Sequence, residues 1–334
     1  MKRVTILDVA NHAGVSKSTV SQYLNKRYDY MAVETKNKIE KAIEELQYQP
    51  NIVARSLKMK RTKTIGVIVA NILHEFSTQI IRAIEDVCHE LDFHIIVCNA
   101  DENPIKEEKY INMLHAKQVD GIIIFPTGGN VELYERLQNG NFPIIFMDRF
   151  VSDINIVSIL LDNEKASTMA VEEFISNGYN RIGIITTSAI KNVTPRLERV
   201  SGYEKAMQEN NLSLMHSYIR SVEIENIQSE FEKILSLPEP PQAILAGNDL
   251  ALIEILKFVN KNQLSIPEDI AVIGIDDVSF ADLYNPPLTT IKQPTFEMGK
   301  KAGELLLEKI NRGDNTTIKS IYRYKPELIR RSSV

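Results

Sequence analysis

Residues 5–25 read TILDVANHAGVSKSTVSQYLN, and this stretch decides the fold of the N-terminal part of the chain. Apolar residues recur at helical spacing over residues 6–13, so a first helix has one side to bury. Gly14 follows directly, and glycine ends helices because it adopts a left-handed backbone at little cost. Ser16 is then a natural N-cap for a second helix that carries Val20. These spacings predict a helix-turn-helix, whose second helix enters the major groove of DNA.

A short helical hairpin with a glycine turn would share the same apolar pattern, so the outward face of the second helix matters. That face carries only polar side chains that can reach a base edge, with no acid among them: Lys17, Ser18, Ser21 and Gln22. A third helix is expected from about residue 34 to 46, with Ile39, Ala42, Ile43 and Leu46 as its buried stripe. Three short helices form a small core, so attachment to a partner or a second domain should stabilise them.

The charge of the chain is distributed unevenly. Residues 1–63 hold thirteen basic and six acidic residues, a net charge of +7. The whole chain of 334 residues has a net charge of −5, which leaves −12 for the remainder. A basic head on an acidic body is the distribution expected of a DNA-binding module attached to a domain that does not touch DNA.

Residues 50–61 are expected to form a hinge and linker. Pro50 stops the third helix, and the residues from Asn51 to Lys58 suit one short helix, which is too short to persist alone in water. We expect this helix to order on DNA, with Leu57 inserted into a minor-groove step and Arg55 on a phosphate. The alternative is a plain linker with an isolated leucine.

Two motifs resemble a known family. The pattern VTIxDVAxxAGVSxxTVS at residues 4–21 and the pattern PNxxARxL at residues 50–57 are similar to the head and hinge of the LacI/GalR family of bacterial repressors. The resemblance extends along nearly the whole chain. It implies that the chain binds double-stranded operator DNA through these side chains: Thr5, Ser16, Lys17, Ser18, Thr19, Ser21, Gln22, Asn25, Asn51, Ala54, Arg55 and Leu57.

The pattern changes from residue 64 onward, where buried apolar runs alternate with amphipathic helical stretches. The expected strands are residues 65–70, 94–100, 121–126, 143–148, 158–162, 181–187, 243–247 and 270–276. Helices are expected at residues 78–91, 105–115, 164–176, 198–209 and 250–261. This alternation predicts an α/β body of parallel sheets covered on both faces. The strands are too many for one comfortable sheet, so two lobes are expected, with a ligand between them.

The family resemblance agrees, because the body of that family is similar to periplasmic sugar-binding proteins. It implies three domains: a head at residues 1–49, the hinge at 50–61 and an effector-binding and dimerisation body at 62–334. The chain should cross between lobes near Leu161, Thr290 and Ser320. Lobe one would then comprise about residues 62–160 and 291–320, and lobe two 161–290 and 321–334.

Several classes of function are disfavoured by what the sequence lacks. No nucleophile, cofactor loop or general-acid pair is recognisable, so an enzyme is not expected. Cys88 and Cys98 do not form a disulfide framework or a metal motif, and we expect neither metal nor cofactor. No apolar run approaches the length of a membrane span, and the N-terminus does not resemble a signal peptide. We therefore expect a cytoplasmic protein without membrane contact.

The candidate effector residues are polar or aromatic side chains that follow strand ends, together with residues that match the family pattern. They are Asn71, His74, Phe76, Asp148, Arg149, Arg196, Arg199, Asn248, Asp249 and Asp276. Other interpretations stay open for several of them. Phe76 also suits a core aromatic, Asp249 and Asp276 also suit helix caps or turns, and Arg149 also suits a surface or interlobe charge.

The ligand is expected to be a sugar or a sugar acid. Carboxylates at these positions would accept hydrogen bonds from sugar hydroxyl groups, and arginines would pair with a carboxylate or phosphate. The hypothesis is an acidic sugar derivative held by Arg199 with help from Arg149 or Arg196. The stretch SQYLNKRYDY at residues 21–30 also resembles the subgroup that responds to 2-keto-3-deoxygluconate.

The resemblance implies a homodimer that represses carbohydrate or sugar-acid catabolism genes from a palindromic operator, each head reading one half-site. Two alternatives remain. A phosphoprotein partner could bind the body as co-repressor, or the chain could be a sugar-binding protein without a DNA function, for which the basic head has no use. The sequence does not decide whether the effector releases or promotes DNA binding.

Two residues depart from the family pattern. Ala32 replaces the serine that usually caps the third helix, so that cap should be weakened. Gln22 replaces an arginine at a base-reading position. Arginine suits guanine, whereas the amide of glutamine suits adenine through two hydrogen bonds.

We therefore predict that Gln22→Arg shifts operator preference from adenine to guanine at one base pair of each half-site. A good bidentate contact is worth about 1–3 kcal/mol, so each protein should discriminate about 5- to 160-fold at that position. Selection of binding sites from randomised DNA with the two proteins measures this. Lys26→Arg is the matched control and should leave the preference unchanged. Identical selected sites for the parent and the Gln22→Arg variant would refute the assignment.

Overall fold

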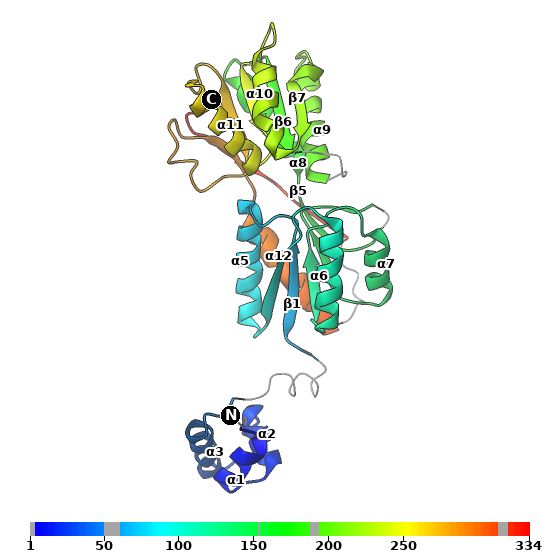
Figure 1. Cartoon of the computed structure of the whole chain (residues 1–334), viewed down its shortest axis with the longest axis vertical. Coiled ribbons are helices and arrows are strands. Elements are labelled where there is room, and N and C mark those ends of the chain that lie inside the picture. Colours follow the sequence, from blue (N-terminus) through cyan, green and yellow to red (C-terminus); the bar gives the residue numbers. More distant parts are fainter. Residues whose placement is uncertain (1–3, 50–60, 153, 188–193, 313–319) are drawn as a thin grey trace. The chain divides into compact units, whose positions relative to one another are not determined.

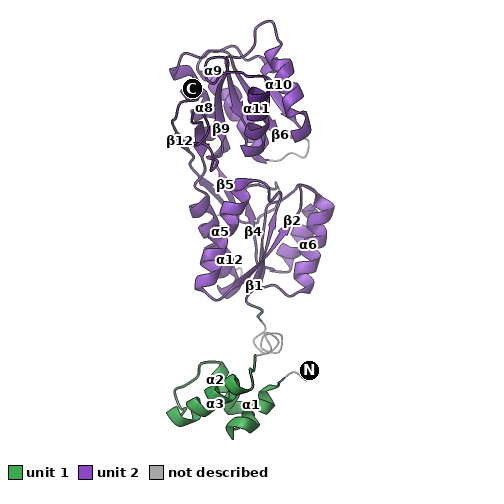
Figure 2. Ribbon diagram, turned by 60° about the vertical axis from the view of Figure 1, so that its left-hand side comes forward, with its two compact units in different colours: residues 1–62 green, residues 63–334 purple. Residues whose placement is uncertain are grey.

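The structure is a computed structural model, which describes residues 4–49, 61–152, 154–187, 194–312 and 320–334. The chain divides into two compact units, residues 1–62 and residues 63–334, which Figure 2 shows in green and purple. Each unit is described by itself below. Among the described residues, no helix is long and apolar enough to cross a membrane.

The first unit is a three-helix head. Its helices are α1 (Ile6–Ala13), α2 (Lys17–Leu24) and α3 (Val33–Glu45). One small apolar core joins them: Val9 and Ala10 of α1, Val20 of α2 and Ile39 and Ala42 of α3 are buried. Tyr48, which follows α3, adds a ring to the same core. The three predicted helices are therefore confirmed. Of the predicted stripe of the third helix, Ile39 and Ala42 are buried, and Ile43 and Leu46 are partly buried against the same core.

The ends of the head helices follow from their flanking residues. Thr5 and Asp8 form a reciprocal capping box at the start of α1, with Asp8 Oδ2 accepting from the Thr5 backbone N at 2.7 Å. Gly14 ends α1 with φ of 66°, in the left-handed region that glycine adopts without strain. Ala32 makes no side-chain hydrogen bond at the start of α3, so the predicted weak cap is confirmed.

The first lobe of the larger unit contains a six-stranded parallel sheet in the order β11-β5-β4-β3-β1-β2. Its strands are β1 (Thr64–Val69), β2 (His94–Asn99), β3 (Gly121–Ile124), β4 (Ile144–Met147), β5 (Ser158–Leu161) and β11 (Ile321–Tyr324). Its helices are α5 (Glu75–Glu90), α6 (Pro104–Ala116), α7 (Val131–Asn139) and α12 (Thr295–Arg312). Helices α5 and α12 cover one face, and α6 and α7 the other (Figure 1).

The second lobe repeats this architecture with the strand order β12-β10-β9-β8-β6-β7. Its strands are β6 (Ile182–Thr187), β7 (Ile219–Val222), β8 (Ala243–Ala246), β9 (Ala271–Ile275), β10 (Thr289–Lys292) and β12 (Glu327–Ile329). Its α-helices are α8 (Asn163–Ser176), α9 (Thr194–Glu209), α10 (Ile227–Leu235) and α11 (Asp249–Lys261). All neighbouring strands run parallel except β10 and β12, which are antiparallel, so the predicted α/β body of parallel sheets is confirmed with one antiparallel pair at this edge.

The chain passes between the lobes three times, after β5, after β10 and after β11. The third crossing comes later than expected. Residues 321–324 pair with β5 in the sheet of the first lobe, whereas the sequence placed them in the second. The boundary near Ser320 is therefore corrected to the two residues after Tyr324, which lie between β11 and β12.

All eight strands expected from the sequence are present, and four others were missed: β7, β10, β11 and β12. Three of the four lie at sheet edges, where one neighbour is absent and side chains stay partly exposed. The helices α7, α10 and α12 were also missed. Continuous burial identified all inner strands except β10, and of the four edge strands the sequence predicted only β2.

Helices α8 and α9 approach each other at Gly202. A Cβ atom placed there would lie 2.4 Å from the backbone oxygen of Glu164, closer than real Cβ atoms come. Only glycine therefore allows this crossing. The crossing matters for the site described below because Arg199 lies on α9 one turn earlier.

We predict that Gly202→Ala lowers the free energy of unfolding of the larger unit by about 2 kcal/mol. Alanine alone would favour the helix by about 1 kcal/mol, so a loss requires the backbone clash with Glu164. Denaturant titration followed by circular dichroism measures the change. Ser201→Ala, at the exposed neighbouring position, is the control and should lie within about 0.5 kcal/mol of the parent. A Gly202→Ala protein as stable as its parent would contradict the close approach.

Candidate functional site: nucleic-acid interface and interlobe cleft

The exposed face of α2 is the candidate nucleic-acid interface of the head. Lys17, Ser18, Gln22 and Asn25 are exposed, whereas Ser21 is half-buried. The Asn25 amide nitrogen donates to the Ser21 backbone oxygen at 2.7 Å, which fixes the end of the helix. The structure therefore places a cation, a hydroxyl and an amide on one open helix face. These groups can donate to phosphate and to base edges.

Three other predicted DNA-contacting residues shape the ends of helices. The Ser16 hydroxyl accepts from the Thr19 backbone N at 3.1 Å and caps α2. The Ser16 and Thr19 hydroxyl oxygens lie 2.8 Å apart. Thr5 is held in the capping box of α1. The other four predicted contacts, Asn51, Ala54, Arg55 and Leu57, lie outside the described residues.

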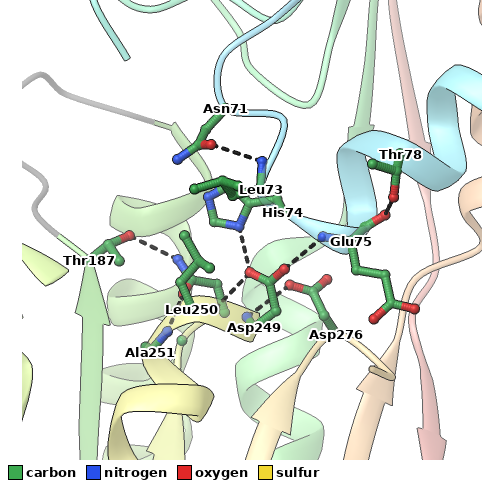
Figure 3. A network of polar contacts seen from close by, with 12 residues as sticks. Asn71, Leu73, His74, Glu75, Thr78, Thr187, Asp249, Leu250, Ala251 and Asp276 are labelled. Carbon is green, nitrogen blue, oxygen red and sulfur yellow. Dashed lines mark hydrogen bonds and ion pairs between the residues drawn. The ribbon is translucent and has the colours of Figure 1, made fainter. Parts of the chain in front are cut away.

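A polar network joins the two lobes of the body around Asp249 (Figure 3). His74, from the loop before α5 in the first lobe, lies with Nδ1 2.5 Å from Asp249 Oδ1. The backbone N of Glu75 donates to Asp249 Oδ2 at 2.8 Å. The two side chains are 15% and 3% exposed, so the contact is largely withdrawn from water. Asp249 thus connects the start of α11 to the start of α5 across the cleft.

Asp276 extends this network within the second lobe. It follows β9 with φ of 93°, a left-handed conformation that turns the chain sharply at the end of the strand. Its Oδ2 accepts from the Asp249 backbone N at 3.3 Å, and its Oδ1 accepts from Gln293 Nε2 at 2.5 Å. Gln293 follows β10, so the network includes the segment that leads back to the first lobe.

The three titratable groups of this network have displaced pKa values. Burial, followed by the charge of Asp249, raises the pKa of Asp276 to about 7. Burial alone would also raise the pKa of Asp249, but the hydrogen bond and charge of His74 and two backbone N–H groups lower it. Burial alone would lower the pKa of His74, but Asp249, Asp276 and Glu102 together raise it. The network therefore favours a protonated His74 beside an ionised Asp249.

A second interlobe cluster contains two of the predicted arginines. Arg149 Nη1 and Nη2 donate to the two carboxylate oxygens of Glu102 at 2.8 and 2.5 Å, a bidentate pair. Arg196, from α9 of the second lobe, donates to Glu102 Oε1 at 2.9 Å. Asp148 lies beside them, with Oδ2 3.6 Å from Arg149 Nε. Burial raises the pKa of Asp148 despite the nearby charges of Arg149 and Arg199.

Arg199 lies buried between the two clusters. Its Nε donates to Asn163 Oδ1 at 2.9 Å and its Nη1 to the Gly247 backbone oxygen at 2.6 Å. Both acceptors are neutral, unlike the carboxylate that holds Arg149. The charge of Arg199 acts on the pKa of Asp148 and of Asp276, which places it near both strand ends.

Three further predicted residues have structural contacts. Asn71 Oδ1 accepts from the Leu73 backbone N at 2.9 Å and forms a turn. Asn248 caps α11, with Oδ1 accepting from Ala251 N at 2.8 Å. Phe76 is buried and packs edge-on against Phe125, with ring centroids 6.2 Å apart. The core interpretation of Phe76 thus has a direct contact behind it, and the helix cap that was considered for Asp249 is made by its neighbour Asn248.

A cavity of about 390 Å³ adjoins the network and has walls from both lobes. Glu75, Phe76 and Gln79 of the first lobe face Asp276 and Gln293 across it. None of Arg149, Arg196 and Arg199 is among its lining residues; Arg149 is hydrogen-bonded to Glu102 and Arg199 to the Gly247 backbone oxygen. The buried Gln293 Oε1 has no hydrogen-bond partner, which leaves an open acceptor at the cavity wall.

Sequence reasoning missed Glu102, Gln293 and Asn163. Glu102 follows a predicted strand, as the chosen residues did, but it reads as one acid within a charged run. Gln293 and Asn163 lie at lobe crossings, beside β10 and β5. The rule that ligand sites lie beyond strand ends would have found Glu102 if applied to β2. Within the described residues, no cluster of His, Cys, Asp and Glu suits a metal ion.

Comparison with known proteins agrees with both units. The family profile described as "Bacterial regulatory proteins, lacI family" matches residues 5–51. The profile described as "Periplasmic binding protein-like domain" matches residues 171–334. The probable transcriptional regulator EndR of Paenibacillus polymyxa is 47% identical and covers 99% of this chain and 98% of its own length. The transcriptional regulator KdgR of Bacillus subtilis is 35% identical, and the match covers 98% of this chain and 97% of KdgR.

Solved structures show the same architecture. A lac repressor dimer bound to operator and the anti-inducer ONPF is 26% identical, with a TM-score of 0.87 over 99% of both chains. The lac repressor bound to ONPG in the repressed state is 27% identical, with a TM-score of 0.87 over 100% of both chains. A helix-turn-helix head attached to a two-lobed α/β body with a charged cleft defines a DNA-binding transcriptional regulator with a ligand-sensing body. The chain belongs to the LacI family of these regulators, and its relatives are regulators, not enzymes.

The displaced pKa of Asp276 predicts a pH-dependent stability. The unfolded carboxyl titrates near 3.8 and the folded one near 7, so the folded body retains a proton between these values that the unfolded chain has lost. The contribution of the Asp276 carboxyl group to the free energy of unfolding is therefore complete below pH 3.8 and is lost as the pH rises toward about 7. Asp276→Asn should remove about 1 kcal/mol per pH unit from the slope of stability within that window.

Denaturant titrations at several pH values between about 5 and 7 measure this slope as the difference between parent and variant. Asp282→Asn, an exposed acid on the same loop, is the matched control and should leave the slope unchanged. Parallel curves for the parent and Asp276→Asn would contradict the assignment.

Proposed function

We propose that the chain is a homodimeric repressor of carbohydrate or sugar-acid catabolism genes that acts in the cytoplasm. In this proposal two heads read the halves of a palindromic operator, and a sugar acid binds in the interlobe cleft and changes operator affinity. Dimerisation is supported by the lac repressor dimer to which the chain is similar. A two-fold dimer matches a two-fold operator, because each subunit then meets the same half-site.

Arg199 is the observation that carries the choice of an acidic ligand. Arg199 is 4% exposed, and the two hydrogen bonds of its guanidinium go to neutral oxygens. A buried cation is stabilised most by an anion with bidentate geometry, which a ligand carboxylate supplies. Asp148 and Asp276, near which Arg199 lies, offer acceptors for the hydroxyl groups of the same ligand. One positive donor group between acceptors is the arrangement that suits a polyhydroxy acid.

The effector class is tested with pairs of ligands that differ mainly in the acid group: D-gluconate with D-glucose, and D-galacturonate with D-galactose. Thermal shift and calorimetry on the full-length protein measure binding. Anisotropy of a labelled operator, obtained by selection from randomised DNA, measures the effect on DNA. We expect the two sugar acids to bind. The neutral sugars should bind at least about tenfold more weakly, because they lack the charged hydrogen bond to the protein. Tight binding of a neutral sugar with no binding of acids would refute the proposal.

Arg199→Lys tests the residue itself. Lysine keeps the charge but loses the planar pair of donors, so sugar-acid affinity should fall about 10- to 100-fold. Operator affinity without ligand should stay within about twofold of the parent, because the head is unchanged. Arg181→Lys is the matched control. Arg181 precedes β6 at the end of the strand that lies away from the cleft, and its Nε donates a hydrogen bond to the Pro240 backbone oxygen. Equal ligand affinity in the Arg199→Lys and Arg181→Lys proteins would exclude Arg199 from the site.

A further inference from the structure

Glu198 directly precedes Arg199 on α9 of the second lobe, yet its carboxylate is held by an arginine of the first lobe. Arg323 of β11 donates to Glu198 from both terminal nitrogens, Nη2 to Oε1 at 2.6 Å and Nη1 to Oε2 at 3.1 Å. Its Nη1 also donates to the Leu161 backbone oxygen, at the end of β5, at 3.2 Å. The pair is therefore bidentate, and it is anchored to the backbone where the chain crosses between the lobes.

Asn163 brings the carboxylate of Glu198 and the guanidinium of Arg199 to the two ends of one amide group. Its Nδ2 donates to Glu198 Oε2 at 3.0 Å, and its Oδ1 accepts from Arg199 Nε at 2.9 Å. The amide nitrogen only donates and the amide oxygen only accepts, so Glu198 fixes the orientation in which the oxygen faces Arg199. Asn163 is 1% exposed, so little water screens the two charges from each other.

Arg199 has a charge that no carboxylate neutralises by direct contact in the part of the chain that the structure describes. Its hydrogen bonds there go to an amide oxygen and a backbone oxygen. Glu198 is its neighbour in the sequence and shares Asn163 with it, so Glu198 is the internal acid best placed to compete with an acidic ligand. Arg323 binds both oxygens of that competitor.

We propose that Arg323 is a positioning residue for recognition of the effector's acid group. It holds the charge of Glu198 at the lobe crossing, so that the charge of Arg199 stays available to the ligand. Without Arg323, the carboxylate of Glu198 lacks a cation and competes with the ligand for Arg199. The inference rests on the proposed acidic effector at Arg199 and deepens it, because part of the specificity of that site then comes from an arginine of the other lobe that acts through Glu198.

Arg323→Gln tests this inference by calorimetry on the full-length proteins with D-gluconate and D-galacturonate. The affinity for a sugar acid that binds the parent should fall about three- to tenfold, within the range of coupling measured for residues of one network. Arg330→Gln is the matched control, because it deprives Glu173 of an arginine that contacts both its oxygens. Glu173 lies ten residues, or about 15 Å, further along α8 than Asn163.

The Arg330→Gln protein should bind the same sugar acid within about twofold of the parent. Equal affinity in the parent and in Arg323→Gln would overturn the proposal. An equal loss in Arg330→Gln and Arg323→Gln would overturn it as well, since the effect would then come from net charge and not from the position of Glu198.

A second substitution separates the charge of Glu198 from the loss of an ion pair. Glu198→Gln combined with Arg323→Gln removes both charges and keeps a side-chain oxygen that can accept from Asn163. This double variant should regain affinity to within about twofold of the parent, although the ion pair is absent. If the pair acted only by holding the lobes together, the double variant would bind as weakly as Arg323→Gln, and the proposal would be wrong.

The interaction between Glu198 and Arg199 can also be measured without a ligand. A double-mutant cycle of Glu198→Gln and Arg199→Gln, followed by denaturant unfolding, gives the coupling between the two residues. In the Arg323→Gln background this coupling should become more favourable by at least about threefold in the equilibrium constant of unfolding. An unchanged coupling would refute the role of Arg323.

These measurements separate the inference from the proposed function. Stronger coupling in the cycle, with no sugar acid bound by any of the proteins, would support the action of Arg323 on Glu198 and Arg199 and exclude the sugar-acid effector. Binding of D-gluconate to the parent without any response to Arg323→Gln would leave the effector class standing and refute the role of Arg323.

Discussion

The carboxylate of Asp249 lies between the N-termini of two helices that belong to different lobes. One oxygen accepts from the backbone N of Leu250 in its own helix at 2.8 Å, and the other accepts from Glu75 at the start of α5. Each helix start carries about half a positive charge, and His74 adds a third donor. These partners together stabilise the negative charge of the buried Asp249 carboxylate. Without it, two helix starts and an imidazole would face one another across the cleft.

Four carboxylates of the two interlobe clusters, Glu102, Asp148, Asp249 and Asp276, divide into two kinds according to their partners. Glu102 and Asp249 are paired with cations from the opposite lobe, and their pKa values are lowered, that of Glu102 to about 2. Asp148 and Asp276 follow β4 and β9 in left-handed conformations, and burial raises their pKa values. The first pair holds the lobes together. The second pair lies at corresponding strand ends of the two lobes and keeps acceptor capacity that interlobe contacts do not use, which supports its proposed role toward ligand hydroxyl groups.

The sequence predicted the central strands because they are buried on both faces, as in residues 122–124 of β3, which are fully buried. It missed β7 (Ile219–Val222) and β11 (Ile321–Tyr324), which lie at sheet edges and have no fully buried residue. The candidate effector residues came from strand ends and family pattern, and two of them, Phe76 and Asp276, line the cavity. The sequence had no way to pair Arg149 and Arg196 with Glu102, because that contact joins segments 47 and 94 residues apart along the chain. Local periodicity carries no information on which charges meet across a cleft.

Two of the contacts between the lobes, that of His74 with Asp249 and that of Glu102 with Arg196, respond to different chemical events. They lie close enough for Glu102 to affect the pKa of His74. The contact between His74 and Asp249 depends on the proton of His74, whose pKa is raised. The contact between Glu102 and Arg196 depends on the charge of Glu102, whose pKa is lowered to about 2, so it does not change with pH near neutrality. In the proposed function an acidic effector enters this cleft, and its negative charge would raise the pKa of His74 further and strengthen the contact with Asp249. The charge of the effector, and not only its fit, would therefore act on the contact between the lobes.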